Sequence, residues 1–308
     1  MSNAVWIRQG NIFNQSHAQV PVVDKNQDYW RIYYSQRFDG KSMPMYIDVS
    51  PDNPTHIIRQ SSHPILERGE IGSFDWAGIM PTDIITVGSS KFLYYIGWSV
   101  RKDVPYHNSL GLAVSHDDGH TWSKFSTGPV FGTSYKEPGY VGTAEIIYEH
   151  NQYYMYYLSC REWVVVNGHP EPKYDIKIAT SSNAIDWNPL NKIAIGLDAG
   201  QGGVSKATVI KINNRFYMWY SVRSESDYRE NPNHGYRIRC AFSDNLLDWV
   251  KIDQYGLGIN GTSGWEQIMV EYPEVLIHQG RLHMYYNGDG FGRTGIGYAT
   301  MDIADLIQ

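Results

Sequence analysis

Three acidic residues stand at equivalent places ahead of aromatic-rich segments, where paired carboxyl groups could perform general acid and base chemistry. Asp83, Glu145 and Glu274 each lie eleven residues before an aligned aromatic residue, and Thr208 takes this place in a fourth segment. Unpaired charges are disfavoured in a core, so these positions favour a functional role. The alternative is that the carboxyls bind strand ends or pair with basic neighbours. We predict that all three are catalytic, with Glu145 as the general acid and its pKa raised by a neighbouring carboxylate such as Asp83.

The elements that must position these carboxyls recur five times along the chain. The chain holds 24 Tyr, 10 Trp and 9 Phe, a density typical of half-buried strands. Each copy has an apolar strand, a polar turn, an aromatic strand and a third strand, and the first four copies offer a fourth strand. Such a meander cannot bury both faces alone and must pack against its neighbours. The aligned aromatic residues, separated by 61, 62, 63 and 66 residues, are Tyr33, Tyr94, Tyr156, Trp219 and Tyr285.

Radial repetition of four-stranded units predicts an all-β fold, a five-bladed β-propeller with antiparallel blades. The last copy has no clear fourth strand, while an apolar segment at the N-terminus precedes the first copy. We therefore expect the N-terminal strand to close the last blade. The whole chain, residues 1–308, is expected to be a single domain, with blades at residues 11–62, 78–128, 141–196, 203–255 and 268–303 plus 4–9.

Further residues are expected on the face that holds the starts of the first strands. The connections between blades are long and rich in glycine, which lets backbone approach a ligand closely. The second strands end in arginine in three copies. Any single charge on a connection, Glu266 included, has the alternative of being a solvated loop charge. From these groups we predict substrate binding by His17, Gln19, Arg37, Asp75, Trp98, Arg161, Lys206, Arg223, Glu271 and Asn287.

Three short motifs carry little chemistry. Residues 115–122 match the Asp box, S-x-D-x-G-x-T-W, which occurs in sialidases and other propellers. The motif supports the fold, and Asp117 is expected to bond local backbone N–H groups on the face away from the catalytic one. Residues 256–261 fit a dinucleotide-binding string, but no helix can follow and we expect a loop. Residues 39–42 resemble the tail of a P-loop without its leading glycine.

Composition excludes several classes of partner. The formal charge is −6 and no run of like charges occurs, which disfavours nucleic acid. No apolar stretch approaches the roughly 18 residues of a membrane span, and the N-terminus has no signal-peptide run, so we expect a cytoplasmic protein without a membrane partner. Cys160 and Cys240 are too few for a disulfide framework or a Cys-rich metal site, and both are expected to be packing thiols. No metal or cofactor is expected.

The chain resembles the superfamily of five-bladed propeller glycosidases, which comprises glycoside hydrolase families 32, 43, 68 and 117 and the family 130 mannoside phosphorylases. It is most similar to glycosidase-like proteins of bacterial surface-polysaccharide loci. The resemblance spans nearly the whole chain and is carried by the strings SHAQVP, FDWAGIMP, YYIGW, EPGY, MWYSVR and YYNGDGFGRTGIGYA.

In family 43 an Asp of blade one is the base, an Asp of blade two tunes the acid, and a Glu of blade three is the acid. The resemblance implies the second role for Asp83 and the third for Glu145. Blade one has no carboxylate at the matching segment, residues 16–21. The missing base could be replaced by Glu274 or Glu271, by His17, or by an anionic acceptor such as phosphate, as in the phosphorylases.

These observations predict an enzyme that acts on a glycosidic or sugar-phosphate bond in bacterial polysaccharide metabolism. Its ligand is expected to be a carbohydrate or sugar phosphate. Arg37, Arg161, Arg223 and Lys206 favour an anionic substrate, because guanidinium suits planar recognition of carboxylate or phosphate. The alternative is a non-catalytic carbohydrate-binding propeller, in which the acidic residues accept sugar hydroxyls and Trp98 stacks on a ring. A protein-interaction scaffold is the weakest alternative.

Overall fold

In the part of the chain that the structure describes, the strands form three sheets. The computed structural model describes residues 6–262 and 264–306. The four-stranded sheet is ordered β1 (Ile7–Phe13), β20 (Ile296–Asp302), β19 (Arg281–Asn287) and β18 (Glu271–His278). The helical segments are short: η1 (Asp253–Tyr255), α1 (Asp289–Gly292) and α2 (Ile303–Leu306).

Each of the other two sheets has eight strands. One contains β2 (Gln19–Lys25), β3 (Trp30–Phe38), β4 (Lys41–Ser50), β5 (Asn53–Gln60), β6 (Gly78–Val87), β7 (Ser90–Ser99), β8 (His107–Ser115) and β9 (Ser123–Lys124). The other contains β10 (Val141–Glu149), β11 (Gln152–Val166), β12 (His169–Ser181), β13 (Asn188–Ile195), β14 (Gln201–Ile212), β15 (Arg215–Ser224), β16 (Arg237–Ser243) and β17 (Val250–Lys251).

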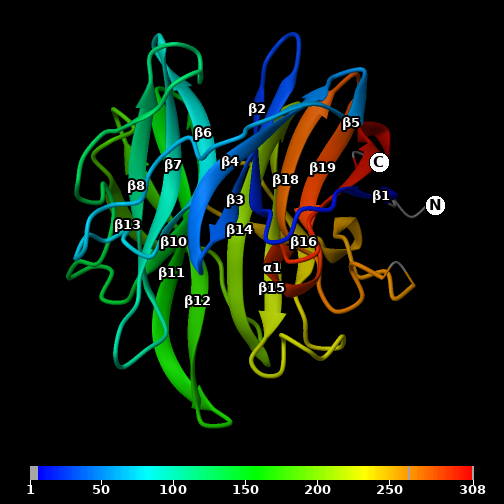
Figure 1. Cartoon of the computed structure of the whole chain (residues 1–308). Coiled ribbons are helices and arrows are strands. Elements are labelled where there is room, and N and C mark those ends of the chain that lie inside the picture. The colour runs from blue at the N-terminus through cyan, green and yellow to red at the C-terminus, as the bar shows by residue number, and fades with distance from the viewer. Residues whose placement is uncertain (1–5, 263, 307–308) are drawn as a thin grey trace.

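Each eight-stranded sheet consists of two antiparallel runs of four strands. The runs are joined by a single parallel bridge, Ser42 with Gly78 in one sheet and Tyr174 with Gly203 in the other. Within every run the strands follow chain order, as expected for a meander. Figure 1 shows these runs side by side around the molecule. The sequence prediction of an almost all-β fold built from antiparallel strands is therefore confirmed.

The aligned aromatic residues lie buried between neighbouring runs. Three tyrosines among them donate a hydrogen bond to a backbone carbonyl of the next run, in the turn before its fourth strand or at the start of that strand, so each joins two runs. The last of these bonds links the final run to the first. The three pairs are Tyr94 with Ala184, Tyr156 with Leu246 at 2.9 Å, and Tyr285 with Pro54 at 2.9 Å.

The expected pairing of the N-terminal strand with the C-terminal strands is present. β1 pairs antiparallel with β20, and both ends of the chain lie on the same side of the molecule in Figure 1. Trp6 is buried against Trp219, with ring centroids 5.8 Å apart, and its Nε1–H donates to the Tyr255 carbonyl oxygen at 3.0 Å. Of the predicted segment 4–9, residues 4 and 5 lie outside the described residues.

Asp117 takes the local role that its motif predicts. One carboxylate oxygen accepts the Thr121 backbone N–H at 2.8 Å and the Ser115 hydroxyl at 2.7 Å. Arg31 donates to the Gly119 carbonyl oxygen at 3.0 Å and thereby ties this turn to the first run. The turn follows the C-terminal end of β8.

Three other sequence expectations concern residues outside the site. Both cysteines are free and buried in strands, Cys160 in β11 and Cys240 in β16, as packing thiols should be. Residues 256–261 form a bridge and loop, as expected. Among the described residues, no helix is long and apolar enough to cross a membrane.

Candidate functional site

The first strand of every run carries an irregularity at the same place. The register shifts in β2, β6, β10, β14 and β18, three residues or fewer before the aligned strand-start position. Three of the residues involved have left-handed backbone: Val20 (φ 55°), Lys206 (φ 40°) and Tyr272 (φ 54°). Such conformations cost about 1–3 kcal/mol each and collect at functional sites. Bulges also redirect side chains, and here they separate an outer layer from a deeper one.

The outer layer forms a pocket of about 260 Å³ into which several runs contribute side chains. Asn108, at the start of β8, lines this pocket, whereas Asp117 follows the other end of that strand, so the two lie at opposite ends of the run. No aspartate or glutamate is among the described residues that line the pocket. Its wall is rich in tyrosine, with Tyr106, Tyr140, Tyr174, Tyr228, Tyr236 and Tyr272.

Four polar side-chain atoms of the pocket lining are buried without a hydrogen-bond partner among the described residues. They are Gln19 Oε1, Trp98 Nε1, Asn108 Oδ1 and Ser205 Oγ. A buried polar group without a partner costs about 1–3 kcal/mol, so a set of them in one pocket points to a ligand that supplies the partners. The set includes acceptors, an N–H donor and a hydroxyl, which together match the hydroxyl groups of a saccharide.

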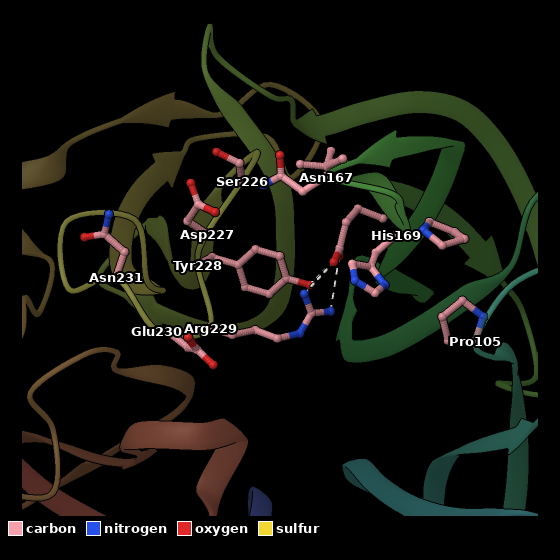
Figure 2. Close-up of a pocket in the computed structure, with 12 residues that line it drawn as sticks. Pro105, Asn167, His169, Ser226, Asp227, Tyr228, Arg229, Glu230 and Asn231 are labelled. Atoms are coloured by element: carbon pink, nitrogen blue, oxygen red, sulfur yellow. Dashed lines mark hydrogen bonds and ion pairs between the residues drawn. The ribbon is translucent and has the colours of Figure 1, made fainter.

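A groove of about 690 Å³ adjoins the pocket and shares Tyr228 and Arg229 with it. Its walls are the projecting β11–β12 hairpin, at the bottom of Figure 1, and residues 226–231. Figure 2 shows Tyr228 and Arg229 converging on one carboxyl group, that of Glu171, which accepts the tyrosine hydroxyl at 2.7 Å. The Arg229 charge is therefore balanced within the groove.

The deeper layer brings together the three predicted catalytic carboxyls around Lys206. The Lys206 Nζ atom is 2.9 Å from Glu274 Oε2 and 4.0 Å from Glu145 Oε2. All four side chains are buried. None of them lines the pocket, although Thr143 and Ser205, which precede two of them in the chain, do.

Each carboxyl of this cluster also accepts a backbone N–H from the first strand of the next run. The sequence left open an alternative in which these carboxyls bind strand ends; here the donors lie inside the strands, and the bonds hold neighbouring runs together. The bonds run from Ile146 to Asp83 at 2.6 Å, from Val209 to Glu145 at 2.8 Å, and from Val23 to Glu274 at 3.1 Å.

Burial dominates the electrostatics of the cluster. It raises the pKa of Asp83 to about 7, with a further contribution from Glu274 and opposition from Lys206. Burial, followed by repulsion from Asp83, raises the pKa of Glu145 well above its usual value. Burial alone would lower the pKa of Lys206, but the negative charges of Glu274 and Glu145 outweigh it and the pKa is raised. The cluster therefore holds carboxyl protons near neutral pH.

Replacing Asp83 with Asn should make the stability of the protein less sensitive to pH. The unfolded chain loses the Asp83 proton near pH 3.8 and the folded chain near pH 7, so its contribution to stability is complete at low pH and lost as the pH rises to about 7. Relative to wild type, the unfolding free energy of Asp83→Asn should therefore rise between about pH 4 and 7 in urea titrations. Other titrating groups, such as His283, are common to both chains. Parallel pH profiles would contradict the assignment.

Three of the predicted substrate-binding residues line the pocket: Gln19, Arg37 and Trp98. Gly78 makes room for Trp98, because a Cβ atom there would lie 2.3 Å from the indole Nε1. His17 is half-buried near Arg37, whose charge lowers its pKa after the larger effect of burial.

Two further predicted residues lie just behind the pocket wall. Glu271 is buried, and neither carboxyl oxygen has a hydrogen-bond partner among the described residues. Burial raises its pKa well above the usual value, with a contribution from Asp289, and the nearby Phe291 N–H acts in the opposite direction. Asn287 accepts the Val20 N–H at 2.8 Å and donates to two backbone carbonyls, so it holds the bulge of β2.

The remaining predicted binding residues do not line the pocket and have internal partners. Asp75 is buried beside Lys124, with 2.6 Å between its Oδ2 and the lysine Nζ. Arg161 is half-exposed, 3.4 Å from Asp175, because β11 continues past it into the projecting hairpin. Arg223 is buried and donates to the Tyr174 hydroxyl at 2.9 Å. Lys206 belongs to the deeper cluster.

Most of the pocket wall was not predicted from the sequence. Ser205 precedes Lys206 and Tyr272 follows Glu271, both of which were predicted binding residues, so the repeat alignment alone could have found them. Tyr106, Tyr228 and Arg229 lie on connections between strands, where no periodic signal marks them.

Comparison with known proteins defines the class of fold. The chain superposes on a glycoside hydrolase with a TM-score of 0.75 and 16% identity, over 96% of this chain and 91% of that one. The superposition on a thermostable family-43 glycoside hydrolase has a TM-score of 0.67 and 16% identity, and it covers 94% of this chain and 91% of that one. The third structure is a member of the family 130 mannoside phosphorylases, a family containing hydrolases of β-1,2-mannosidic linkages. Its superposition has a TM-score of 0.67 and 13% identity, and it covers 95% of this chain and 86% of that one. The chain thus has the fold of the propeller glycosidases, and the resemblance in its sequence is confirmed.

Relatives in sequence define the family. Two proteins from strains of Mycobacterium tuberculosis, both described as uncharacterised, are 30% identical over 96% of this chain and 99% of their own length. The chain belongs to their family. A β-1,2-mannobiose phosphorylase from a Thermoanaerobacter species is 29% identical over 35% of this chain and 37% of its own. No family model matches the chain.

Proposed function

We propose that the chain is a single five-bladed propeller domain over residues 1–308, with one blade for each four-stranded run. Two sets of contacts support a closed ring. Glu274 of the last run accepts the Val23 N–H of the first, and Tyr285 bonds the Pro54 carbonyl oxygen. β1 then serves as the outer strand of the last blade.

The pocket binds a saccharide. The observation that carries this proposal is the set of four unpartnered polar atoms in a tyrosine-rich wall. Aromatic faces offer apolar contact to sugar rings, while the polar atoms exchange hydrogen bonds with hydroxyl groups. The solved structures of similar fold include glycoside hydrolases, and one relative in sequence is a phosphorylase of a mannoside.

The reaction is cleavage or transfer at a glycosidic or sugar-phosphate bond in bacterial polysaccharide metabolism. Glu145 donates the proton to the leaving group, because its raised pKa keeps it protonated near neutral pH. Asp83 lies beside it and contributes to that shift. Glu274 is paired with Lys206 and balances the charge of the cluster.

A second candidate function is saccharide binding without turnover. It is favoured by one observation: no carboxyl side chain is among the described residues of the pocket lining. In this function Asp83, Glu145 and Glu274 serve only as the backbone acceptors that join neighbouring runs.

Glu145→Gln distinguishes the two functions. The amide oxygen can still accept the Val209 N–H, so the fold and saccharide binding should persist, while loss of the acid should lower kcat about 10²–10⁴-fold. The assay is product release from a panel of oligosaccharides with and without phosphate, alongside calorimetric binding. Glu149→Gln is the matched control, since Glu149 is at the other end of β10 and pairs with Lys211 at the surface.

Three outcomes are informative. Turnover by the wild type that Glu145→Gln abolishes and Glu149→Gln retains supports the enzyme. Binding by the wild type without turnover of any panel member supports the second function. No binding of any saccharide overturns both.

A further inference from the structure

A cluster of positive charge lies at the rim of the pocket. Arg37 lines the pocket at the end of β3. Both Arg37 and Arg293 act electrostatically on His17, where they add to the effect of burial in lowering its pKa. Arg293 lies against the turn of α1, since a Cβ atom on Gly290 would be 3.0 Å from its Nε atom. The next residue of that turn, Phe291, lines the pocket.

Among the described residues, these two arginines have no ion-pair partner. Neither Arg37 nor Arg293 forms an ion pair or side-chain hydrogen bond there, whereas Arg229 at the same pocket is paired with Glu171. Both arginines are exposed and both act on the same side chain, His17, in a protein of net charge −6. A positive region in an otherwise acidic protein attracts and concentrates an anionic ligand.

The segments that carry the cluster are held in place. The Gln19 side chain donates to the Phe291 carbonyl oxygen at 2.6 Å, and Asn287 donates to the carbonyl oxygens of Ala18 and Gly295. These bonds join the start of β2, next to His17, to the segment that contains Arg293. The backbone around His17 and Arg293 is therefore held in place before a ligand binds, which lowers the entropic cost of binding.

We propose that Arg37 and Arg293, with His17 beside them, bind the anionic substituent of a saccharide whose ring occupies the pocket. The substituent is a carboxylate or a phosphate, the two groups that match the guanidinium fork. This proposal rests on the proposed saccharide-binding function. Arg161, Arg223 and Lys206, which were also predicted to bind an anion, have internal partners and are not part of this rim. Of the rim residues, only Arg37 and His17 were predicted from the sequence.

The test compares saccharides that differ only in charge. Calorimetric titration of the full chain would use triplets of methyl glycosides: the neutral hexose, its uronic acid and its 6-phosphate. The wild type should bind a charged member at least about tenfold more tightly than the neutral one. Arg37→Gln and Arg293→Gln should each weaken that binding about 10–100-fold, the usual worth of a hydrogen bond to a charged group. Affinity for the neutral member should fall much less than affinity for the charged one.

Lys25→Gln is the control for net charge. It removes one positive charge at the end of β2 away from the pocket and should leave all affinities unchanged. Preference for the uronic acid or for the 6-phosphate tells which anion the rim takes. Equal affinity of the wild type for neutral and charged members overturns the anion proposal and leaves saccharide binding intact. A loss of affinity in Lys25→Gln equal to that in the arginine variants overturns it in the same way. Absence of binding by every member overturns the proposed function itself.

Discussion

Lys206→Met is expected to lower the free energy of unfolding at pH 7 by about 3–5 kcal/mol, the usual effect of removing one partner from a buried ion pair. Lys206 is the cation that Glu274 and Glu145 contact, and all three are buried. Without it, the Glu274 carboxylate is left without its partner in a buried site of low dielectric constant. The loss should be smaller at pH 5, where the raised pKa values of Asp83 and Glu145 keep both protonated and the cluster carries less negative charge. Urea denaturation at both pH values measures it.

Two further variants make this result specific. Lys211→Met removes an exposed lysine 2.8 Å from Glu149, and it should cost no more than about 1 kcal/mol. Adding Glu274→Gln to Lys206→Met should restore part of the lost stability, because it removes the carboxylate nearest to the missing ammonium group. A loss that is equal for both lysines, or that does not change with pH, would show that the buried cluster does not depend on its cation.

Deleting residues 1–10 should destabilise the protein by about 5 kcal/mol or more. The deletion removes the buried Trp6 and most of β1, and it leaves β20 as an exposed edge. Truncation of a buried aromatic residue alone costs about 3–5 kcal/mol. It also removes Arg8, whose Nε atom is 3.2 Å from the buried carboxyl of Glu266.

The measurement is chemical and thermal denaturation of the truncated chain beside two point variants. Trp6→Ala should account for most of the loss. Ile7→Ala, in which the replaced side chain is exposed, should change stability by no more than about 0.5 kcal/mol. Thermal stability of the truncated chain equal to that of the wild type would remove the proposal that the N-terminal strand closes the fold.

Much of the fold could be predicted because strand pairing in meanders follows local sequence. Alternating apolar and aromatic residues mark each strand, and tight polar turns leave adjacent strands few ways to pair. The same repeat alignment correctly predicted that Asp83, Glu145 and Glu274 lie together. Equivalent positions on the first strands of neighbouring runs lie side by side, since each carboxyl binds the next strand. The cytoplasmic location and the number of blades stay predictions.

Only the tertiary structure decided which residues form the pocket. A bulge before each strand-start position separates two layers, so the carboxyls lie in the deeper layer while Gln19 and Ser205 line the pocket. The register shift comes from the local backbone, as at Val20 and Lys206, and residue spacing does not reveal it. The tyrosines of the wall come in part from connections whose paths depend on packing between runs. Sequence thus determined the repeating units and their shared axis, whereas long-range packing determined which side chains were left without internal partners and therefore available to a ligand.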